Sequence, residues 1–262
     1  GFRIKYQKMG KDTGSYRVED IGESEMADEY GYALRDLLIE DHQNIIDVKG
    51  IEDRIIYEDI PSKNDIFDQI LGKIERKETI TFEYKPFRTG VRYNYTIEPY
   101  ALKLFKRRWY LLGNQRTKAE QNPDLKYVPT GMYSLSLDRI QKVSSEYETF
   151  KLPQGYNANK FFEDYFGVIT TDKGKFIKPS TIRLKVYTNK HKHLYIESLP
   201  LHKSQKITER HNDYWIFEYR LAISFDLIQE ILMHREDVEV LEPQELRASV
   251  KDALQKTLIR YE

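Results

Sequence analysis

The chain of 262 residues contains no cysteine, which excludes disulfides and thiolate metal sites. It also has no apolar run near the roughly 20 residues that a membrane helix needs, and its amino end lacks the apolar centre of a signal peptide. We therefore expect a cytoplasmic protein without a membrane partner. The length leaves room for two compact domains, each with its own core.

Motifs of enzyme active sites are missing as well. The sequence has no Gly-rich phosphate loop, no His-Glu-x-x-His pair and no nucleophile elbow. His191 and His193 have a spacing that suits a metal ion, but no nearby carboxylate or Cys completes a ligand set. Asp36 and Glu40 lie four residues apart on an acidic segment, where a solvated helix face is the simpler interpretation. We predict no enzyme activity, no metal site and no cofactor.

Charge is balanced in total but unevenly distributed along the chain. The 42 Lys and Arg equal the 42 Asp and Glu, yet residues 19–68 hold 16 acidic and 4 basic side chains. Residues 73–118 hold 12 basic and 4 acidic ones. A basic module attracts anionic ligands if the fold gathers its charges within the ~8 to 10 Å that salt leaves unscreened.

The amino-terminal part alternates apolar and polar residues in a way that predicts a β-hairpin over residues 2–19. Apolar residues at helical spacing predict an acidic amphipathic helix over 25–40 and a second helix over 63–76. Five short strands with tight turns follow, and they favour a small SH3-like or Sm-like β-barrel. These strands are predicted at residues 79–84, 93–97, 99–104, 109–112 and 133–140.

The carboxy-terminal part has a different order of elements. After an aromatic connector, strands and helices are predicted in the order βαββαβ, which is the ferredoxin-like arrangement. They lie at residues 181–187, 192–198, 202–210, 214–222, 225–234 and 238–241. A last helix over 243–261 has one apolar side, so it covers the sheet or pairs with a second copy of the chain.

The most informative segment is Arg-Arg-Trp-Tyr-Leu at residues 107–111, with Leu-Asp-Arg-Ile at 137–140. A Trp-Tyr-Leu strand that follows three cations offers stacking faces and phosphate partners together. In the structural alternative, Trp109 and Leu111 fill a core and the cations keep a hairpin tip solvated. Spacing alone favours that alternative.

Together with the two element orders, these segments resemble the bacterial WYL-domain transcription regulators that carry a WYL C-terminal extension. The resemblance implies an α+β protein whose SH3/Sm-like barrel is preceded by helices and followed by the ferredoxin-like extension. Its implied parts are a hairpin that is the wing remnant of a helix-turn-helix domain, an acidic helical connector, the WYL barrel, an aromatic connector and the extension. Their boundaries are 1–20, 21–77, 78–150, 151–178 and 179–262.

The resemblance also implies a function. It predicts the ligand-sensing and dimerisation region of a regulator, a homodimer that binds an oligonucleotide or nucleotide-like effector at the barrel. Operator DNA would be bound only through the amino-terminal domain, whose recognition helix we expect upstream of Gly1, so we predict no operator binding by this chain. The alternative is a purely structural module in which the basic strand meets the acidic segment 19–68.

By the same resemblance, Arg108 and Arg139 contact phosphate, which an Arg fork binds in bidentate fashion. Tyr110 stacks on a base, while Trp109 and Leu111 pack inward. The predicted effector-binding residues are Tyr84, Lys85, Lys103, Arg108, Tyr110 and Arg139.

Three positions near these residues leave alternatives open. Arg139 has an equally weighted second interpretation, a salt bridge with Asp138 or another nearby carboxylate. Ser136 and Asn114 depart from the family pattern, which has Arg at the first position and an aromatic residue or His at the second. The effector is then a different one, or it binds more weakly.

Overall fold

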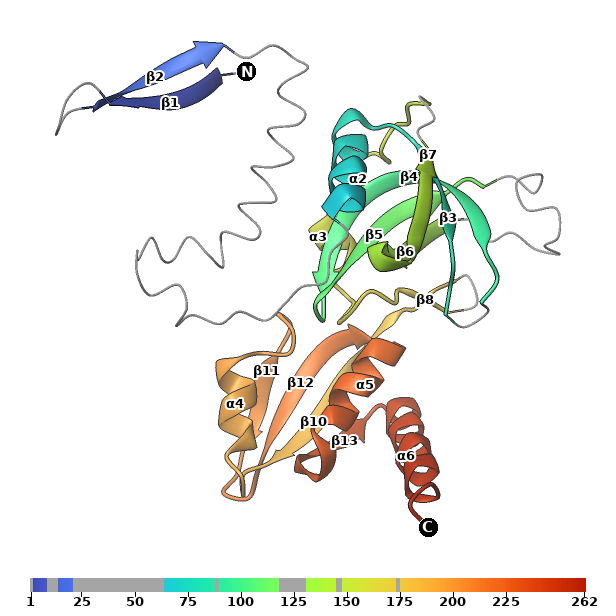
Figure 1. Cartoon of the computed structure of the whole chain (residues 1–262). Helices are drawn as coiled ribbons and strands as arrows, with labels where there is room; N and C mark the ends of the chain where they lie inside the picture. Colours follow the sequence, from blue (N-terminus) through green and yellow to red (C-terminus); the bar gives the residue numbers. More distant parts are fainter. Residues whose placement is uncertain are drawn as a thin grey trace. The chain divides into compact units, whose positions relative to one another are not determined.

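The computed structural model describes residues 2–8, 14–20, 64–87, 90–117, 131–144, 148–172 and 175–262. These residues form antiparallel sheets with few helices, in two compact units (Figure 1). The first unit comprises residues 1–128 and 135–151, and the second comprises 129–134 and 152–262. Of the helices described, none is long and apolar enough to cross a membrane. The helix predicted at 25–40 lies outside the described residues.

The predicted amino-terminal hairpin is confirmed. Strands β1 (Phe2–Lys8) and β2 (Gly14–Asp20) pair in antiparallel fashion, with Phe2 opposite Asp20 and Lys8 opposite Gly14. Its origin as the wing of a helix-turn-helix domain stays a prediction.

The first unit contains helix α2 (Asn64–Arg76) and most of a five-stranded sheet in the order β6-β5-β4-β3-β7, of which residues 131–134 of β6 are grouped with the second unit. The single strand predicted at 133–140 is wrong, because β6 ends at Ser136 and a 3-10 helix, η3 (Leu137–Arg139), separates it from β7. Among the described residues, β6 and β7 end this order without pairing to each other, so the sheet is not seen to close into a barrel. The strands are β3 (Ile80–Tyr84), β4 (Tyr93–Phe105), β5 (Arg108–Gln115), β6 (Gly131–Ser136) and β7 (Ile140–Ser144).

The prediction of separate strands on the two sides of Pro99 is wrong, because β4 runs through this residue. The pairing of β4 with β5 shifts register between Pro99 and Ala101, and such a bulge accommodates a proline that cannot donate a ladder hydrogen bond. Gly113 lies opposite Pro99. A Cβ at Gly113 would lie 2.6 Å from the carbonyl oxygen of Glu98, so the close approach of the strands requires glycine.

The core of the first unit follows the period-two alternation of β3. Ile80, Phe82 and Tyr84 are buried, and the residues between them are half-buried. Helix α2 contacts β4, and its buried Phe67 packs on Trp109 of β5 with 4.9 Å between ring centroids. The inward packing predicted for Trp109 and Leu111 is confirmed, since Leu111 is fully buried and Trp109 is half-buried against α2.

The second unit has the predicted order of strands and helices, and its four-stranded sheet runs β11-β12-β10-β13. Alternate residues of β10, including Leu184, are buried with side chains from α4, α5 and the start of α6, so these helices cover one sheet face. The elements are β10 (Pro179–Tyr187), α4 (Lys192–Ser198), β11 (Lys206–Arg210), β12 (Tyr214–Ala222), α5 (Phe225–Met233), η4 (Arg235–Asp237), β13 (Val238–Glu242) and α6 (Gln244–Leu258).

The segment before β10 contains α3 (Ala158–Phe161) and a small ribbon of β8 (Thr171–Asp172) and β9 (Lys175–Phe176). It is tied to α5 by the buried carboxylate of Asp226. This carboxylate accepts the backbone N–H groups of Val168 and Ile169 at 2.8 and 2.9 Å. Because these bonds satisfy buried backbone donors, the segment is held as part of the second unit.

Candidate functional site

The turn between β4 and β5 brings three cations together. Phe105 pairs with Arg108, which leaves a two-residue loop of Lys106 and Arg107. Both loop residues have positive φ, 45° and 65°, as a type I′ hairpin turn requires. Asn and Gly are the residues that favour such a turn, so Lys and Arg occupy it against their backbone preference.

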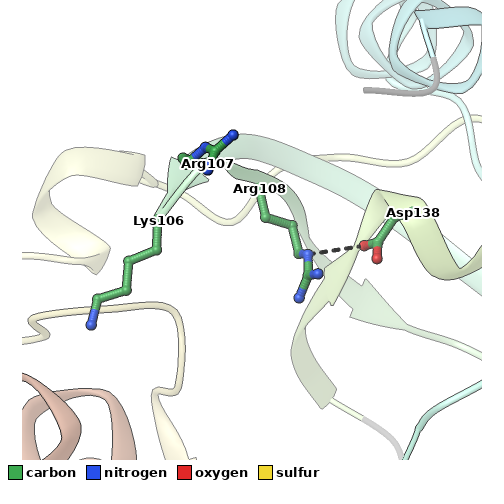
Figure 2. Close-up of a pocket in the computed structure, with 4 residues that line it drawn as sticks. All are labelled: Lys106, Arg107, Arg108 and Asp138. Carbon is green, nitrogen blue, oxygen red and sulfur yellow. Dashed lines mark ion pairs between the residues drawn. The ribbon is translucent and has the colours of Figure 1, made fainter. Parts of the chain in front are cut away.

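This turn borders a hollow of about 310 Å³ lined by Lys106, Arg107, Arg108 and Asp138. We call it the basic hollow. Figure 2 shows the side chain of Arg108 pointing toward Asp138, and Lys106 extending to the same side of the turn. The lining residues are three cations and one carboxylate, so the lining carries an excess of positive charge that attracts an anion.

Among the described residues that line the hollow, Asp138 is the only acid, and it is held on two sides. Its Oδ1 lies 3.4 Å from Nε of Arg108, and the hydroxyl of Ser136 donates a hydrogen bond to the same oxygen. The side chains of Arg108 and Asp138 are 42% and 31% exposed. Solvent therefore screens their ion pair, which contributes at most about 1 kcal/mol.

Tyr84 was predicted at the rim of the site, but its side chain is buried and only 4% exposed. Its ring packs near those of Phe82 and Tyr95, and its hydroxyl accepts the backbone N–H of Ser136 at 3.3 Å. Burial raises the pKa of the Tyr84 hydroxyl, while the neighbouring Arg139 guanidinium acts in the opposite direction. Tyr84 thus supports the turn that carries Asp138.

Arg139 lies outside the lining of the basic hollow. Its guanidinium carbon sits 4.1 Å from the ring centroid of Phe87, which is 72% exposed. Its Nε is buried without a hydrogen-bond partner in the described part of the chain. The salt bridge predicted between Arg139 and Asp138 is not formed: Asp138 pairs with Arg108, and Arg139 makes a cation–π contact with Phe87.

The other predicted contacts also lie outside the lining. Lys103 and Tyr110 are half-buried and face each other across β4 and β5. Lys85 is exposed, and its backbone N–H donates to the carbonyl of Arg139 at 3.4 Å, which ties the end of β3 to η3. Of the six predicted residues, the structure therefore places only Arg108 in the basic hollow.

Sequence reasoning missed part of this site. The sequence predicts Lys106 and Arg107 only as cations that flank the Trp-Tyr-Leu strand, and Asp138 only as a partner of Arg139. The run of three basic residues at 106–108 is the signal that could have placed Lys106 and Arg107 in the site. Phe87 was not singled out, because nothing local marks it as exposed. In the described residues, no three His, Asp or Glu side chains are grouped as metal ligands would be.

Asn114, which departs from the family pattern, belongs to a buried polar cluster instead of a ligand site. Its amide donates to Oε2 of Glu98 at 2.8 Å, and the hydroxyl of Tyr100 donates to the same oxygen at 3.0 Å. Arg116 binds Oε1 at 2.7 Å. These bonds satisfy a carboxylate that is only 5% exposed.

Comparison with known proteins gives two family matches. The WYL domain matches residues 65–144, and the WCX domain matches residues 178–258. No curated protein matches the sequence.

Similar solved structures include proteasome accessory factor B/C (PafBC) of Arthrobacter aurescens, at 20% identity and a TM-score of 0.33. That match covers 97% of this chain and 38% of the other. A CRISPR Cas-related protein is 11% identical with a TM-score of 0.41, over 76% of this chain and 51% of the other. The chain thus spans about half or less of each of these two proteins.

Proposed function

The chain belongs to the WYL-domain proteins that carry a WCX domain, and we propose that it is the ligand-sensing and dimerisation region of a bacterial transcription regulator. The proposed ligand is an oligonucleotide or a nucleotide-like anion bound in the basic hollow. The observation that carries this proposal is the set of three cations around one hollow, with a single acid among the lining residues.

The geometry of the turn supports a role for its charges. A non-glycine residue at positive φ costs about 1 kcal/mol, and Lys106 and Arg107 both adopt it. Such backbone conformations are enriched at binding and active sites, and here two consecutive residues adopt them beside the hollow, whereas Lys77 and Arg235 adopt them singly elsewhere. Replacing them by Asn and Gly would relieve the backbone and remove two cations, so the sequence keeps charge at the expense of turn stability.

The size of the hollow limits what enters it. At about 310 Å³ it lies at the lower end of the volumes of small-molecule sites, roughly 300 to 1,000 Å³. It therefore accommodates one phosphate with its sugar, and the rest of an oligonucleotide would lie on the surrounding surface. Phe87 offers an exposed ring for a base there, with Arg139 on the same ring as a cation.

Further parts of the proposal concern the whole chain. We assign an SH3-like fold to the first sheet, and a ferredoxin-like fold to the second unit, supported by its βαββαβ order and its sheet order β11-β12-β10-β13.

A homodimer is supported by the exposed apolar residues Leu254 and Leu258 on α6. Operator binding is assigned to a part of the regulator outside this chain, and no enzyme activity is assigned.

Titration of a short single-stranded DNA or RNA against the wild-type protein tests the proposed ligand class. We expect binding that weakens with salt, and about tenfold weaker binding by Arg108→Ala, because a charge-assisted contact contributes about 1.5 kcal/mol. Arg139→Ala is expected to weaken binding as well, through loss of the support for Phe87. Arg76→Ala, which removes a half-exposed arginine at the end of α2, is the matched control and is expected to bind like wild type.

The second candidate is the purely structural module. It is favoured by one observation, the ion pair that Arg108 already makes with Asp138. Absence of salt-sensitive binding in the wild type and in all variants would support this candidate and contradict the sensing function.

A further inference from the structure

The basic hollow contains an anion of its own. The carboxylate of Asp138 occupies the side of the hollow that faces Arg108, with Oδ1 at 3.4 Å from the guanidinium Nε (Figure 2). A phosphate that binds Arg108 through the same face must displace this carboxylate or share the guanidinium with it. Asp138 is therefore placed to compete with a bound anion.

The position of Asp138 is set by buried groups behind it. Ser136 is 1% exposed, and its hydroxyl donates to Asp138 while its backbone N–H donates to the buried hydroxyl of Tyr84. This series of contacts starts in the core of the first unit and ends at the hollow. The carboxylate is thus held beside Arg108 and is not a freely rotating surface group.

We propose that Asp138 is an internal competitor that occupies Arg108 when the hollow is empty and lowers its affinity for weak anions. This inference rests on the proposed function, since it concerns the same hollow. It predicts that the site selects phosphate, which offers more acceptor oxygens and more charge than a carboxylate, over carboxylate-bearing ligands.

The energetics of the pair suit such an exchange. A partly exposed ion pair contributes little free energy. A phosphate that contacts Lys106 and Arg107 as well as Arg108 therefore gains more binding free energy than the broken Arg108–Asp138 pair costs. A fully buried pair would resist displacement, because breaking it leaves an uncompensated charge. Solvent around Arg108 and Asp138 instead stabilises both groups after they separate.

The test compares wild type with Asp138→Asn and Asp138→Glu, using a labelled single-stranded oligonucleotide of about ten nucleotides at several salt concentrations. We expect Asp138→Asn to bind about two- to fivefold more tightly, which matches loss of an exposed ion pair. Asp138→Glu keeps the charge and is expected to stay close to wild type. Glu75→Gln removes one exposed charge of α2 outside the hollow and serves as the control for net charge.

A second arm uses acetate as a competitor. We expect acetate to displace the oligonucleotide more effectively from Asp138→Asn than from wild type, because the variant no longer supplies its own carboxylate. Circular dichroism of each variant establishes that it is folded.

Three outcomes overturn the inference, and they are distinguishable. If wild type binds the oligonucleotide and Asp138→Asn binds it more weakly, Asp138 contacts the ligand. If the two bind equally, Asp138 has no effect on binding. Either result leaves the sensing function in place. An equal gain in Glu75→Gln assigns the effect to net charge. Absence of binding in every protein overturns both the inference and the proposed function.

Discussion

At the scale of single residues, Glu98 shows how a buried charge is accommodated in the first unit. Burial alone would raise its pKa, but hydrogen bonds from Asn114, Arg116 and Tyr100 outweigh burial and hold the pKa below its ordinary value of 4.5. A lowered pKa in the folded state means that Glu98 stabilises the fold above about pH 4.5. This contribution is lost as the pH falls through the folded-state pKa.

We therefore predict that Glu98→Gln lowers the free energy of unfolding at pH 7 by about 1 to 3 kcal/mol, because an amide replaces the charged acceptor of Arg116. The difference from wild type should shrink below pH 4.5, where wild-type Glu98 becomes protonated and loses the same bonds. Urea denaturation at several pH values measures it, with the exposed Glu262→Gln as the control. A difference that does not depend on pH would contradict the assignment.

The residues of η3 show a limit of sequence reasoning at the same scale. Asp138 and Arg139 are neighbours in the chain, and a salt bridge between them was one interpretation. In a 3-10 helix, consecutive side chains point about 120° apart, so these two side chains contact different parts of the fold. Asp138 meets Arg108, and Arg139 meets Phe87.

Among the secondary-structure elements, the β4–β5 turn combines an unfavourable backbone conformation with the positive charge that is proposed to bind an anion. Its place between two strands was predicted from the apolar residues on both sides, but its two-residue length and positive φ values follow from the pairing of Phe105 with Arg108. Right-handed strand twist favours a turn of this kind. The cations at its tip are held in place by the sheet and not by their own preference.

The double variant Lys106→Asn/Arg107→Gly is predicted to raise the free energy of unfolding by about 1 kcal/mol, because both residues then suit positive φ. It should also weaken oligonucleotide binding and reduce the salt dependence, since each lost phosphate contact lowers the logarithmic slope by roughly 0.7 for a single strand. Urea denaturation and a salt series of titrations measure the two effects.

The control for this trade-off is Lys77→Gly. Lys77 also has positive φ, 54°, and is exposed, but it lies next to the end of α2 and outside the lining of the hollow. We expect it to gain stability without a change in binding. A double variant that binds as well as wild type would show that the charges of the turn do not hold the ligand.

Over the molecule as a whole, the described residues form two cores that are built in different ways. In the first unit, α2 packs on a five-stranded sheet. In the second, α4, α5 and the start of α6 cover one face of a four-stranded sheet. Because each unit encloses its own apolar residues, we expect each to unfold with its own free energy.

Leu184→Ala tests this expectation, since Leu184 is 1% exposed in the core of the second unit. We predict that hydrogen exchange of β10 and β12 amides becomes less protected by about 2 to 5 kcal/mol, the usual loss for such a cavity. Amides of β3 and β4 should keep their wild-type protection. Lys251→Ala, at an exposed position of α6, is the control. An equal loss in both sheets would show a single cooperative unit.

Most of the elements and their order were predictable from the amino-acid sequence, except the break at Pro99 and the single strand at 133–140, which is β6, η3 and the start of β7. Apolar residues at period two and at helical spacing act locally, so β3, α2 and the βαββαβ order of the second unit followed from neighbours in the chain. The basic residues 106–108 also marked the correct hairpin. The strand boundary predicted at Pro99 was wrong, because a bulge depends on the partner strand, and the pattern of neighbouring residues does not reveal that strand.

Which side chains contact each other became known from the folded chain alone. Tyr84 was predicted at a ligand surface, but the packing of β3 under Ser136 buries it. Arg108 meets Asp138 because the β4–β5 turn and η3, far apart in sequence, border the same hollow. Such contacts depend on how strands pair and how turns point, and these are properties of the folded chain and not of any short segment.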